Sequence, residues 1–198
     1  MRAVRIYGYA ASINVRKVLW TCDEIGIPFT REDSAGARNP VGLVPVLEDD
    51  GATVWESNTI VRYLAASRGR SDLLPDDPKE RANVENWMDW QGSDLNNTWR
   101  YAFQALVRRN PDYQDPRAIA VSTRQFTAAM GIVDAQLRKT AAYVAGATFT
   151  VADVAIGLAV QRWFGLPCDK PGYADVRRYY ELLCERPAFA RHGRDGGP

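Results

Sequence analysis

The sequence contains only one histidine, His192, which lies close to its C-terminal end. A histidine-based catalytic triad or a histidine-rich metal site is therefore not expected, and we predict no metal. Cysteine is also scarce. Cys22, Cys168 and Cys184 are odd in number and lack Cys-x-x-Cys spacing. They predict unpaired thiols in a reducing cytoplasm.

Excess charge and long apolar runs are absent as well. Lys and Arg total 25 and Asp and Glu total 24, so there is no electrostatic reason to expect a nucleic-acid partner. The longest apolar stretch, 154–160, is too short to span a membrane. The start, Met1–Tyr7, lacks the apolar core of a secretory signal. The 198 residues, 46% of them apolar, predict a soluble globular protein of one or two domains.

The first seventy residues predict a small α/β domain, 1–70. A strand, a helix and a second strand follow one another, which implies a right-handed parallel crossover. Asn14 is the expected N-cap of that first helix, and Gly26 its C-terminal stop. Two antiparallel strands and another helix complete the domain. The expected strands are 3–7, 29–32, 45–48 and 53–55, and the expected helices are 15–25 and 57–66.

One connection in this domain is unusually short. Only about ten residues separate Glu32 from Leu43, and they show no helical pattern. Either the chain crosses the sheet with a short loop, or residues are missing between Glu32 and Asn39. Both alternatives remain open at the level of the sequence.

The rest of the chain predicts an all-helical domain, 77–198, after a linker, 71–76. The first helix keeps its apolar spacing to about Arg109, and we expect it to bend near Gly92. The segment 151–164 is apolar on nearly all sides and should be the buried central helix. The other expected helices are 116–137, 174–185 and 187–192.

The start of the expected central helix carries a capping box. Thr150 is the expected N-cap and Asp153 the third helical residue, with Phe149 and Val154 placed to form a hydrophobic staple. We interpret Thr150 and Asp153 as a structural cap.

Two stretches of the first domain predict a binding site. Pro45 precedes an edge-like strand and can follow a cis peptide bond, which would leave the Val44 main chain free to pair with an extended ligand. Ser57 opens a helix, whose N–H groups favour a carboxylate, and Glu56 can pair with an ammonium group. An α-amino acid end carries both groups. The alternative is a plain helix cap with a complementary charge.

Ser12 and Asn14 lie where the first strand gives way to the first helix. A thiolate placed there would gain from the Ser12 hydroxyl and the helix dipole. The alternative is that both side chains only cap the helix.

These stretches, in this order, resemble the cytosolic glutathione S-transferase family, in particular its bacterial, theta-like, serine- and threonine-type members. The resemblance covers about 3–192. The family's fold is a thioredoxin-like α/β domain followed by an all-α domain, which agrees with the division predicted above. The matching motifs are Tyr7-Gly8-x-x-x-Ser12-x-Asn14, Asn39-Pro40-x-Gly42-x-Val44-Pro45, Glu56-Ser57-x-x-Ile60-x-x-Tyr63-Leu64, Phe149-Thr150-x-x-Asp153 and Arg186-Pro187-Ala188-Phe189.

The resemblance implies roles for specific residues. Ser12 would hold the glutathione sulfur and favour its thiolate, with Asn14 as a second candidate. The main chain of Val44, before Pro45, would pair with the cysteinyl part. Glu56 and Ser57 would hold the ammonium and carboxylate groups of the γ-glutamyl end. Arg38 would be a weaker stand-in at the glycine end.

A second-substrate pocket between the domains is also implied, with Tyr9, Trp99 and Tyr101 as candidates. Tyr7 is interpreted as a structural tyrosine at the end of a strand. No cysteine lies in the active-site loop, so the mixed-disulfide chemistry of cysteine-type classes is not expected.

The implied reaction is attack of the glutathione thiolate on a small apolar electrophile, with glutathione as co-substrate and the protein a homodimer. Two alternatives stay open. One is glutathione-dependent reduction of peroxides or disulfides. The other is a non-catalytic, partner-binding scaffold of the same fold, because fold alone does not determine function.

Overall fold

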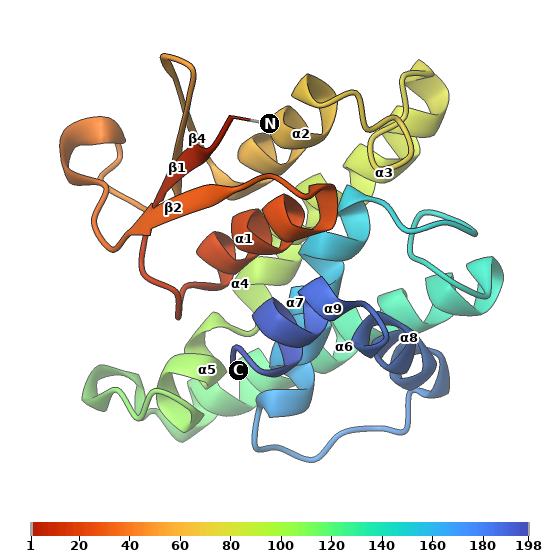
Figure 1. The fold of residues 1–198 in the computed structure, drawn as a ribbon. Helices are drawn as coiled ribbons and strands as arrows, with labels where there is room; N and C mark the ends of the chain where they lie inside the picture. Colours follow the sequence, from red (N-terminus) through yellow and green to blue (C-terminus); the bar gives the residue numbers. More distant parts are fainter. Residues whose placement is uncertain (1, 198) are drawn as a thin grey trace.

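The N-terminal part of the chain forms a four-stranded mixed sheet (Figure 1). The computed structural model describes residues 2–197. Strand β1 is parallel to β2 and antiparallel to β3, which is in turn antiparallel to β4. Ile6 lies opposite Arg31 on one side and opposite Leu47 on the other. The strands, in the spatial order β2-β1-β3-β4, are β1 Val4–Tyr7, β2 Phe29–Glu32, β3 Val46–Asp49 and β4 Ala52–Trp55.

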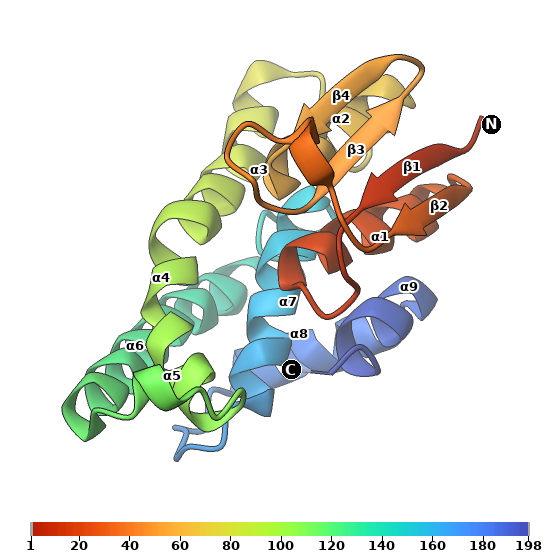
Figure 2. The ribbon, with the colours of Figure 1, turned by 90° about the vertical axis from the view of Figure 1, so that its left-hand side faces the viewer.

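Helices α1 (Ile13–Ile25) and α2 (Ser57–Ser67) pack against each other beside this sheet, as Figure 2 shows. Helix α1 begins two residues earlier than its apolar pattern predicted. Ser12, with extended backbone angles of φ −75° and ψ 123°, is the N-cap. The expectation that Asn14 caps the helix was therefore wrong, because Asn14 already lies inside the first turn. Gly26 ends the helix with a left-handed φ of 78°, as expected.

The short connection after β2 contains a single 3-10 turn, η1 (Gly36–Arg38). It still covers part of the sheet, since Ala35 is buried against Tyr7 and Val46. The chain passes from β2 to β3 without further regular structure.

The remainder of the described chain is helical. The long helix expected to reach Arg109 is interrupted by a π-helical turn that includes Gly92, and such insertions commonly bend helices. The helix is therefore interrupted where a bend was expected, and a series of short helices follows. The elements are α3 Pro78–Trp90, η2 Gln91–Leu95, α4 Asn96–Thr98, α5 Arg100–Leu106, η3 Pro111–Tyr113, α6 Pro116–Thr140, α7 Val151–Gly165, α8 Ala174–Cys184, α9 Pro187–Phe189 and η4 Ala190–Arg194.

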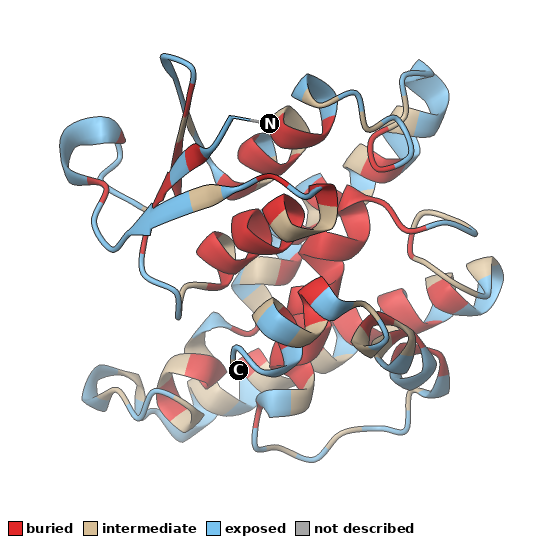
Figure 3. Ribbon diagram, viewed as in Figure 1, coloured by how far each residue is buried: buried red, intermediate tan, exposed pale blue. Residues whose placement is uncertain are grey.

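Helix α7 is the buried centre of the molecule, as its sequence predicted (Figure 3). It packs on α1 through Gly157. A Cβ atom at this glycine would lie 3.1 Å from the Trp20 ring and 2.6 Å from Leu183, so any larger residue would push these side chains away. The linker docks on the same helix, because the Val151 N–H donates to the Leu73 carbonyl oxygen at 3.0 Å. The two parts of the chain therefore share one apolar core.

The capping box at the start of α7 is present. The Thr150 N–H donates to the Asp153 carboxylate at 2.8 Å. The same carboxylate accepts the Val144 N–H and the Tyr179 hydroxyl, each at 2.9 Å. Burial raises the pKa of Asp153 to about 6, although the hydrogen bonds oppose that shift. Asp153 thus connects α8 and the preceding loop to α7, which is more than a local cap.

Within residues 2–197, the structure shows the surroundings of the few cysteines and of the single histidine. The three cysteines are unpaired, and burial raises the pKa of the Cys22 thiol to about 12. The His192 imidazole lies 2.8 Å from the Asp23 carboxylate. No cluster of three metal-ligating His, Cys, Asp or Glu side chains occurs in this range. Nor does any helix in it have the length and apolar character needed to cross a membrane.

Replacing Asp153 tests this buried connection. We expect Asp153→Ala to lower the free energy of unfolding by about 3 kcal/mol or more, since it leaves several buried donors without an acceptor. The matched control is Asp115→Ala, which removes the exposed N-cap of α6 and should cost about 1 kcal/mol. Urea unfolding measures both values. Equal losses would contradict the connecting role of Asp153.

Candidate functional site

A cavity of about 570 Å³ lies between the sheet domain and the helical part. Its first wall is formed by the loop before α1, the first turn of α1 and the start of α2. Its second wall is formed by α4, α5 and α7. The residues that line it are Tyr9, Ala11, Ser12, Ile13, Asn14, Leu43, Glu56, Asn96, Trp99, Arg100, Phe103, Gln104, Arg108 and Arg162.

A smaller hollow of about 40 Å³ adjoins this cavity. Asn14, Leu43 and Glu56 line both spaces, so the two form one continuous cleft. The remaining residues around the hollow are Asn39, Val44, Pro45 and Ser57. The residues expected to bind the main chain and the amino-acid end of a peptide-like ligand therefore meet at one end of the cleft.

The Val44–Pro45 peptide bond is cis. Asn39 holds the preceding loop, because its side-chain amide donates to the Leu43 carbonyl oxygen at 2.7 Å. In the part of the chain that the structure describes, neither the N–H nor the C=O of Val44 makes a hydrogen bond. This main-chain edge is available to an extended ligand, as β-strand addition requires.

Glu56 adopts an uncommon backbone conformation, with φ 68° and ψ 116°. Non-glycine residues rarely occupy such positive φ values, which cost about 1–3 kcal/mol and concentrate at functional sites. Glu56 is the N-cap of α2 but makes no side-chain cap within the described chain, and the residue lines the cleft. The first N–H groups of α2 follow it directly. A carboxylate acceptor for an ammonium group and a helix N-terminus for an anion thus lie side by side.

Ser12 and Asn14 lie at the N-terminus of α1. Both line the large cavity, and Asn14 also borders the smaller hollow. The Ser12 carbonyl oxygen accepts the first helical hydrogen bond, from the Arg16 N–H at 3.0 Å. Its hydroxyl makes no cap bond within residues 2–197, so it remains available to a ligand. Asn14 supports the binding end, since its Oδ1 accepts from the Ser57 hydroxyl at 3.3 Å. Ser12 is therefore the better placed of the two to contact a sulfur atom.

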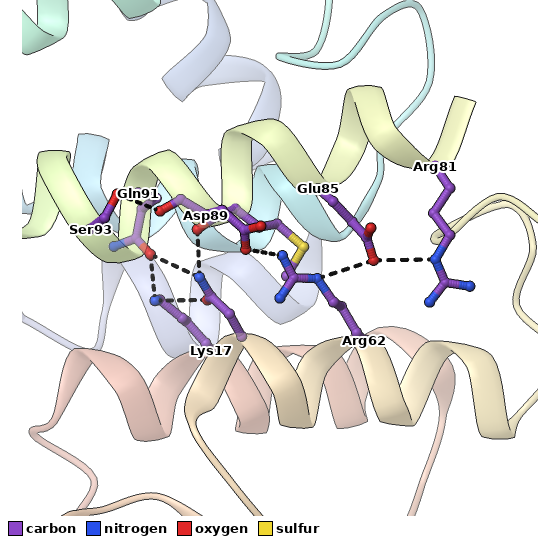
Figure 4. A network of polar contacts seen from close by, with 9 residues as sticks. Lys17, Arg62, Arg81, Glu85, Asp89, Gln91 and Ser93 are labelled. Carbon is purple, nitrogen blue, oxygen red and sulfur yellow. Dashed lines mark hydrogen bonds and ion pairs between the residues drawn. The ribbon is translucent and has the colours of Figure 1, made fainter. Parts of the chain in front are cut away.

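Lys17 lies beneath this site and was not among the residues expected from the sequence. Figure 4 shows its side chain reaching from α1 to the first residue of η2. The ammonium group donates to Gln91 Oε1 at 2.6 Å and to Asn58 Oδ1 at 3.0 Å, and it lies 3.5 Å from Ser57 Oγ. Lys17 thus ties the start of α2 to the π-helical turn.

Burial is the main influence on the charge of Lys17. The side chain is 2% exposed, and no carboxylate in the described chain forms an ion pair with it. Burial lowers the pKa of Lys17 to about 7, and the Glu56 carboxylate opposes that shift. The ammonium group is therefore only marginally stable in its charged form near neutral pH.

Of the three candidates for the second-substrate pocket, two line the large cavity and one does not. Tyr9, which is 52% exposed, and the buried Trp99 both line the large cavity. Tyr101 does not, so this expectation was wrong. Its ring packs on Tyr113, 5.0 Å away between centroids, and its hydroxyl accepts the Asp115 N–H. Tyr101 follows Trp99 by two residues, which corresponds to a rotation of about 200° around a helix axis. Its side chain therefore lies on the face opposite the one that lines the cavity.

Arg38 is not brought to the cleft either. Its guanidinium lies over the Tyr7 ring, 4.1 Å from the centroid, and its Nε donates to Glu48 at 2.9 Å. The buried Tyr7 donates to the same carboxylate at 2.8 Å. The η1 turn holds Arg38 over the sheet, so it does not line the space next to Val44. Tyr7 has the structural surroundings that its position predicted.

A second residue overlooked in the sequence is Arg162. It is a charged residue in the last turn of a helix that is otherwise apolar on nearly all sides, and that contrast was the signal in the sequence. Lys17 offered no comparable signal. It stands next to Arg16 in an amphipathic helix, where a pair of basic residues normally lies on the exposed face.

Comparison with known proteins decides the family. A family model described as the glutathione S-transferase N-terminal domain matches residues 6–72. Glutathione S-transferase GstB of Escherichia coli strain K12 is 38% identical over 176 residues, which covers 82% of this chain and 84% of that protein. The chain belongs to the glutathione S-transferase family.

Two further similar proteins carry different names and match different shares of the chain. A theta-class glutathione S-transferase from Xanthomonas axonopodis pv. citri, solved with glutathione bound, is 35% identical with a TM-score of 0.89, covering 98% of each chain. Elongation factor 1-gamma 1 of Oryza sativa subsp. japonica is 30% identical over 118 residues, which is 59% of this chain but 27% of that protein. The similarity to the transferases therefore spans both parts of the fold.

The pH dependence of stability tests the burial of Lys17. A folded-state pKa near 7, below an unfolded value near 10.4, means that the folded protein binds fewer protons over that interval. Stability from this group is lowest below about pH 7 and rises by up to roughly 1 kcal/mol per pH unit toward pH 10. Lys17→Met removes this dependence. Its stability relative to the wild type should therefore be greatest near neutral pH and decline as the pH rises.

Urea unfolding of both proteins between about pH 7 and pH 10 measures that difference. Lys79→Met, which removes an exposed lysine on α3, is the control and should show a constant difference from the wild type. A constant difference for Lys17→Met as well would show that Lys17 keeps an ordinary pKa.

Proposed function

We propose that this protein is a glutathione transferase, in which the glutathione thiolate attacks an electrophilic carbon of a small, mostly apolar molecule. The observation that carries this proposal is the continuous cleft. It joins a free main-chain edge at Val44, an acidic residue before a helix N-terminus at Glu56 and Ser57, and an unpaired hydroxyl at Ser12. A partner-binding scaffold would need none of these groups in one cleft.

Glutathione has the chemistry that this cleft complements. Its γ-glutamyl ammonium would pair with Glu56 and its carboxylate would accept N–H groups at the start of α2, next to Ser57. Its cysteinyl main chain would pair with Val44. The sulfur would then extend toward Ser12. Arg38 lies away from this path, so we assign it no contact with glutathione.

Catalysis would rest on stabilising the thiolate and holding it near the electrophile. A thiol such as that of Cys has a pKa near 8.5, and lowering it by about two units requires nearly 3 kcal/mol of preference for the anion. The Ser12 hydroxyl and the unpaired N–H groups in the first turn of α1 can together supply a preference of that size. Asn14 would act mainly by holding Ser57.

We also propose that the protein is a cytoplasmic homodimer with a role in detoxification. Ile132, which is 53% exposed, lines an apolar cavity of about 380 Å³ between η2 and α6, and Trp55 on β4 is 39% exposed. Burial of such side chains stabilises subunit contacts. The three unpaired cysteines suit a reducing compartment.

The dimer is tested by light scattering. At micromolar protein concentration it should give twice the mass of the chain.

Ser12→Ala tests the catalytic assignment. We expect kcat/KM toward a chlorodinitrobenzene to fall about 10- to 100-fold, because one charge-assisted hydrogen bond to the thiolate is lost. The pKa of the bound glutathione thiol, followed by the ultraviolet absorbance of the thiolate, should rise. Glutathione affinity measured by calorimetry should change little, since the proposed binding contacts are made by other residues.

Ser71→Ala, at an exposed position in the linker, is the control and should behave like the wild type. Full activity of Ser12→Ala would move the thiolate contact to Asn14 or to main-chain N–H groups. Absence of glutathione binding by the wild type would refute the transferase proposal and favour the scaffold. An organic peroxide as a second substrate distinguishes transferase from peroxidase activity.

A further inference from the structure

Arg162 is a buried cation without a partner in the wall of the large cavity. It lies on α7, is 4% exposed and lines the cavity. The guanidinium packs against two neighbouring aromatic rings, 4.3 Å from the Trp99 centroid and 3.9 Å from the Phe103 centroid. Within residues 2–197 it makes no ion pair, and its Nε has no hydrogen-bond partner. Such a group would normally be paired with a carboxylate.

The surroundings of Arg162 add more positive charge. Arg100 and Arg108 line the same cavity, and the buried Arg16 lies close enough to lower the pKa of Arg162. None of these four arginines forms an ion pair with an acidic residue of the described chain. Burial and the neighbouring arginines lower the pKa of Arg162 to about 9, which leaves it charged at neutral pH. Among residues 2–197, Glu56 is the only acidic one that lines the cavity.

Position separates these arginines from the proposed glutathione site. Glu56 belongs to the first wall, and Ser57 and Val44 line the adjoining hollow. The cavity-lining arginines belong to α5, its following loop and α7 on the second wall, from which Arg108 donates to the Ala11 carbonyl oxygen at 3.4 Å. The Trp99 indole N–H, on the second wall, is also buried without an acceptor within the described chain. Within the described chain, the second wall thus has several hydrogen-bond donors and no acidic side chain that could accept their hydrogen bonds. An uncharged, wholly apolar co-substrate would leave the buried Arg162 guanidinium and the Trp99 indole N–H unpaired.

We propose that the electrophilic co-substrate carries an anionic group, such as a carboxylate, and that Arg162 binds this group. The inference rests on the proposed transferase function and specifies the substrate class of the same site. Trp99 and Phe103 would contact the apolar part of the molecule while holding the guanidinium in place. Arg108 and Arg100, which are exposed, would attract the anion toward the cavity.

The reaction itself needs no further reactant. With a chloroarene carboxylate, the glutathione sulfur forms a bond to the ring carbon, the carbon–chlorine bond breaks, and chloride leaves with the bonding electron pair. The thiol proton passes to solvent. Arg162 takes no part in these bond changes; it positions the substrate through an ion pair at the opposite end of the ring.

A matched pair of electrophiles tests the proposal. We suggest 4-chloro-3,5-dinitrobenzoate and 4-chloro-3,5-dinitrobenzamide, which share the ring and the leaving group but differ in charge. After division by the uncatalysed rate of each compound with glutathione, kcat/KM should be at least about 10-fold higher for the benzoate. Arg162→Gln should lower this preference by about 10-fold or more, and Arg162→Lys should retain part of it.

Arg124→Gln is the control, because it removes an exposed, unpaired arginine on α6 that does not line the cavity. It should keep the wild-type preference. Calorimetry with 3,5-dinitrobenzoate and 3,5-dinitrobenzamide provides a readout that needs no turnover. The wild type should bind the benzoate at least about 10-fold more tightly, even if Arg162→Gln proves too unstable to study.

Two outcomes would overturn the proposal. One is equal preference and equal binding of both compounds by the wild type. The other is an unchanged preference for the benzoate in folded Arg162→Gln. If that variant loses activity equally toward both electrophiles and the thiol pKa of bound glutathione rises, Arg162 acts on the thiolate instead. By contrast, binding of the benzoate without any binding of glutathione would refute the transferase function alone.

Discussion

The close approach of α1 to α7 is the contact on which the rest of the molecule depends. Gly157 provides space for it, because a Cβ atom there would lie only 3.1 Å from the ring of Trp20, which is fully buried at this crossing, and 2.6 Å from Leu183 of α8. Trp20 then packs on Phe189, 4.9 Å away between ring centroids, and so brings α9 onto the same core. The crossing also sets the N-terminus of α1, with Ser12, against the wall that contains Arg162. Gly157 is therefore one of the residues on which the geometry of the cleft depends.

The cleft is built at a cost in stability. Lys17 and Arg162 are both buried without a carboxylate partner in the described chain, and Glu56 has an unfavourable backbone conformation. Each feature lies within or directly beneath the cleft, and each is balanced by the apolar packing of α1 and α7. Unfavourable groups gathered in one place, with favourable contacts elsewhere, are expected of a site selected for ligands rather than for stability.

Much of the architecture was predictable because local signals and the fold agree. The four strands, the α2 boundary near Ser57, the buried character of α7 and the capping box at Thr150 all appear as expected. The errors have physical reasons. Asn14 and Ser12 are equally good caps, so the start of α1 was misplaced by two residues. A π-helical turn has no sequence pattern of its own, so the break after Trp90 was seen only as a bend.

The sequence by itself determined the order of the elements, the family motifs and the residues that line the binding end of the cleft, because these depend on neighbours within a few positions. Only the tertiary structure decided which side chains face the cleft from distant segments. It placed Arg38 over Tyr7, turned Tyr101 away, and brought Lys17 and Arg162 next to the site. Those outcomes depend on how helices far apart in the chain pack together, and spacing along the sequence carries no measure of that packing.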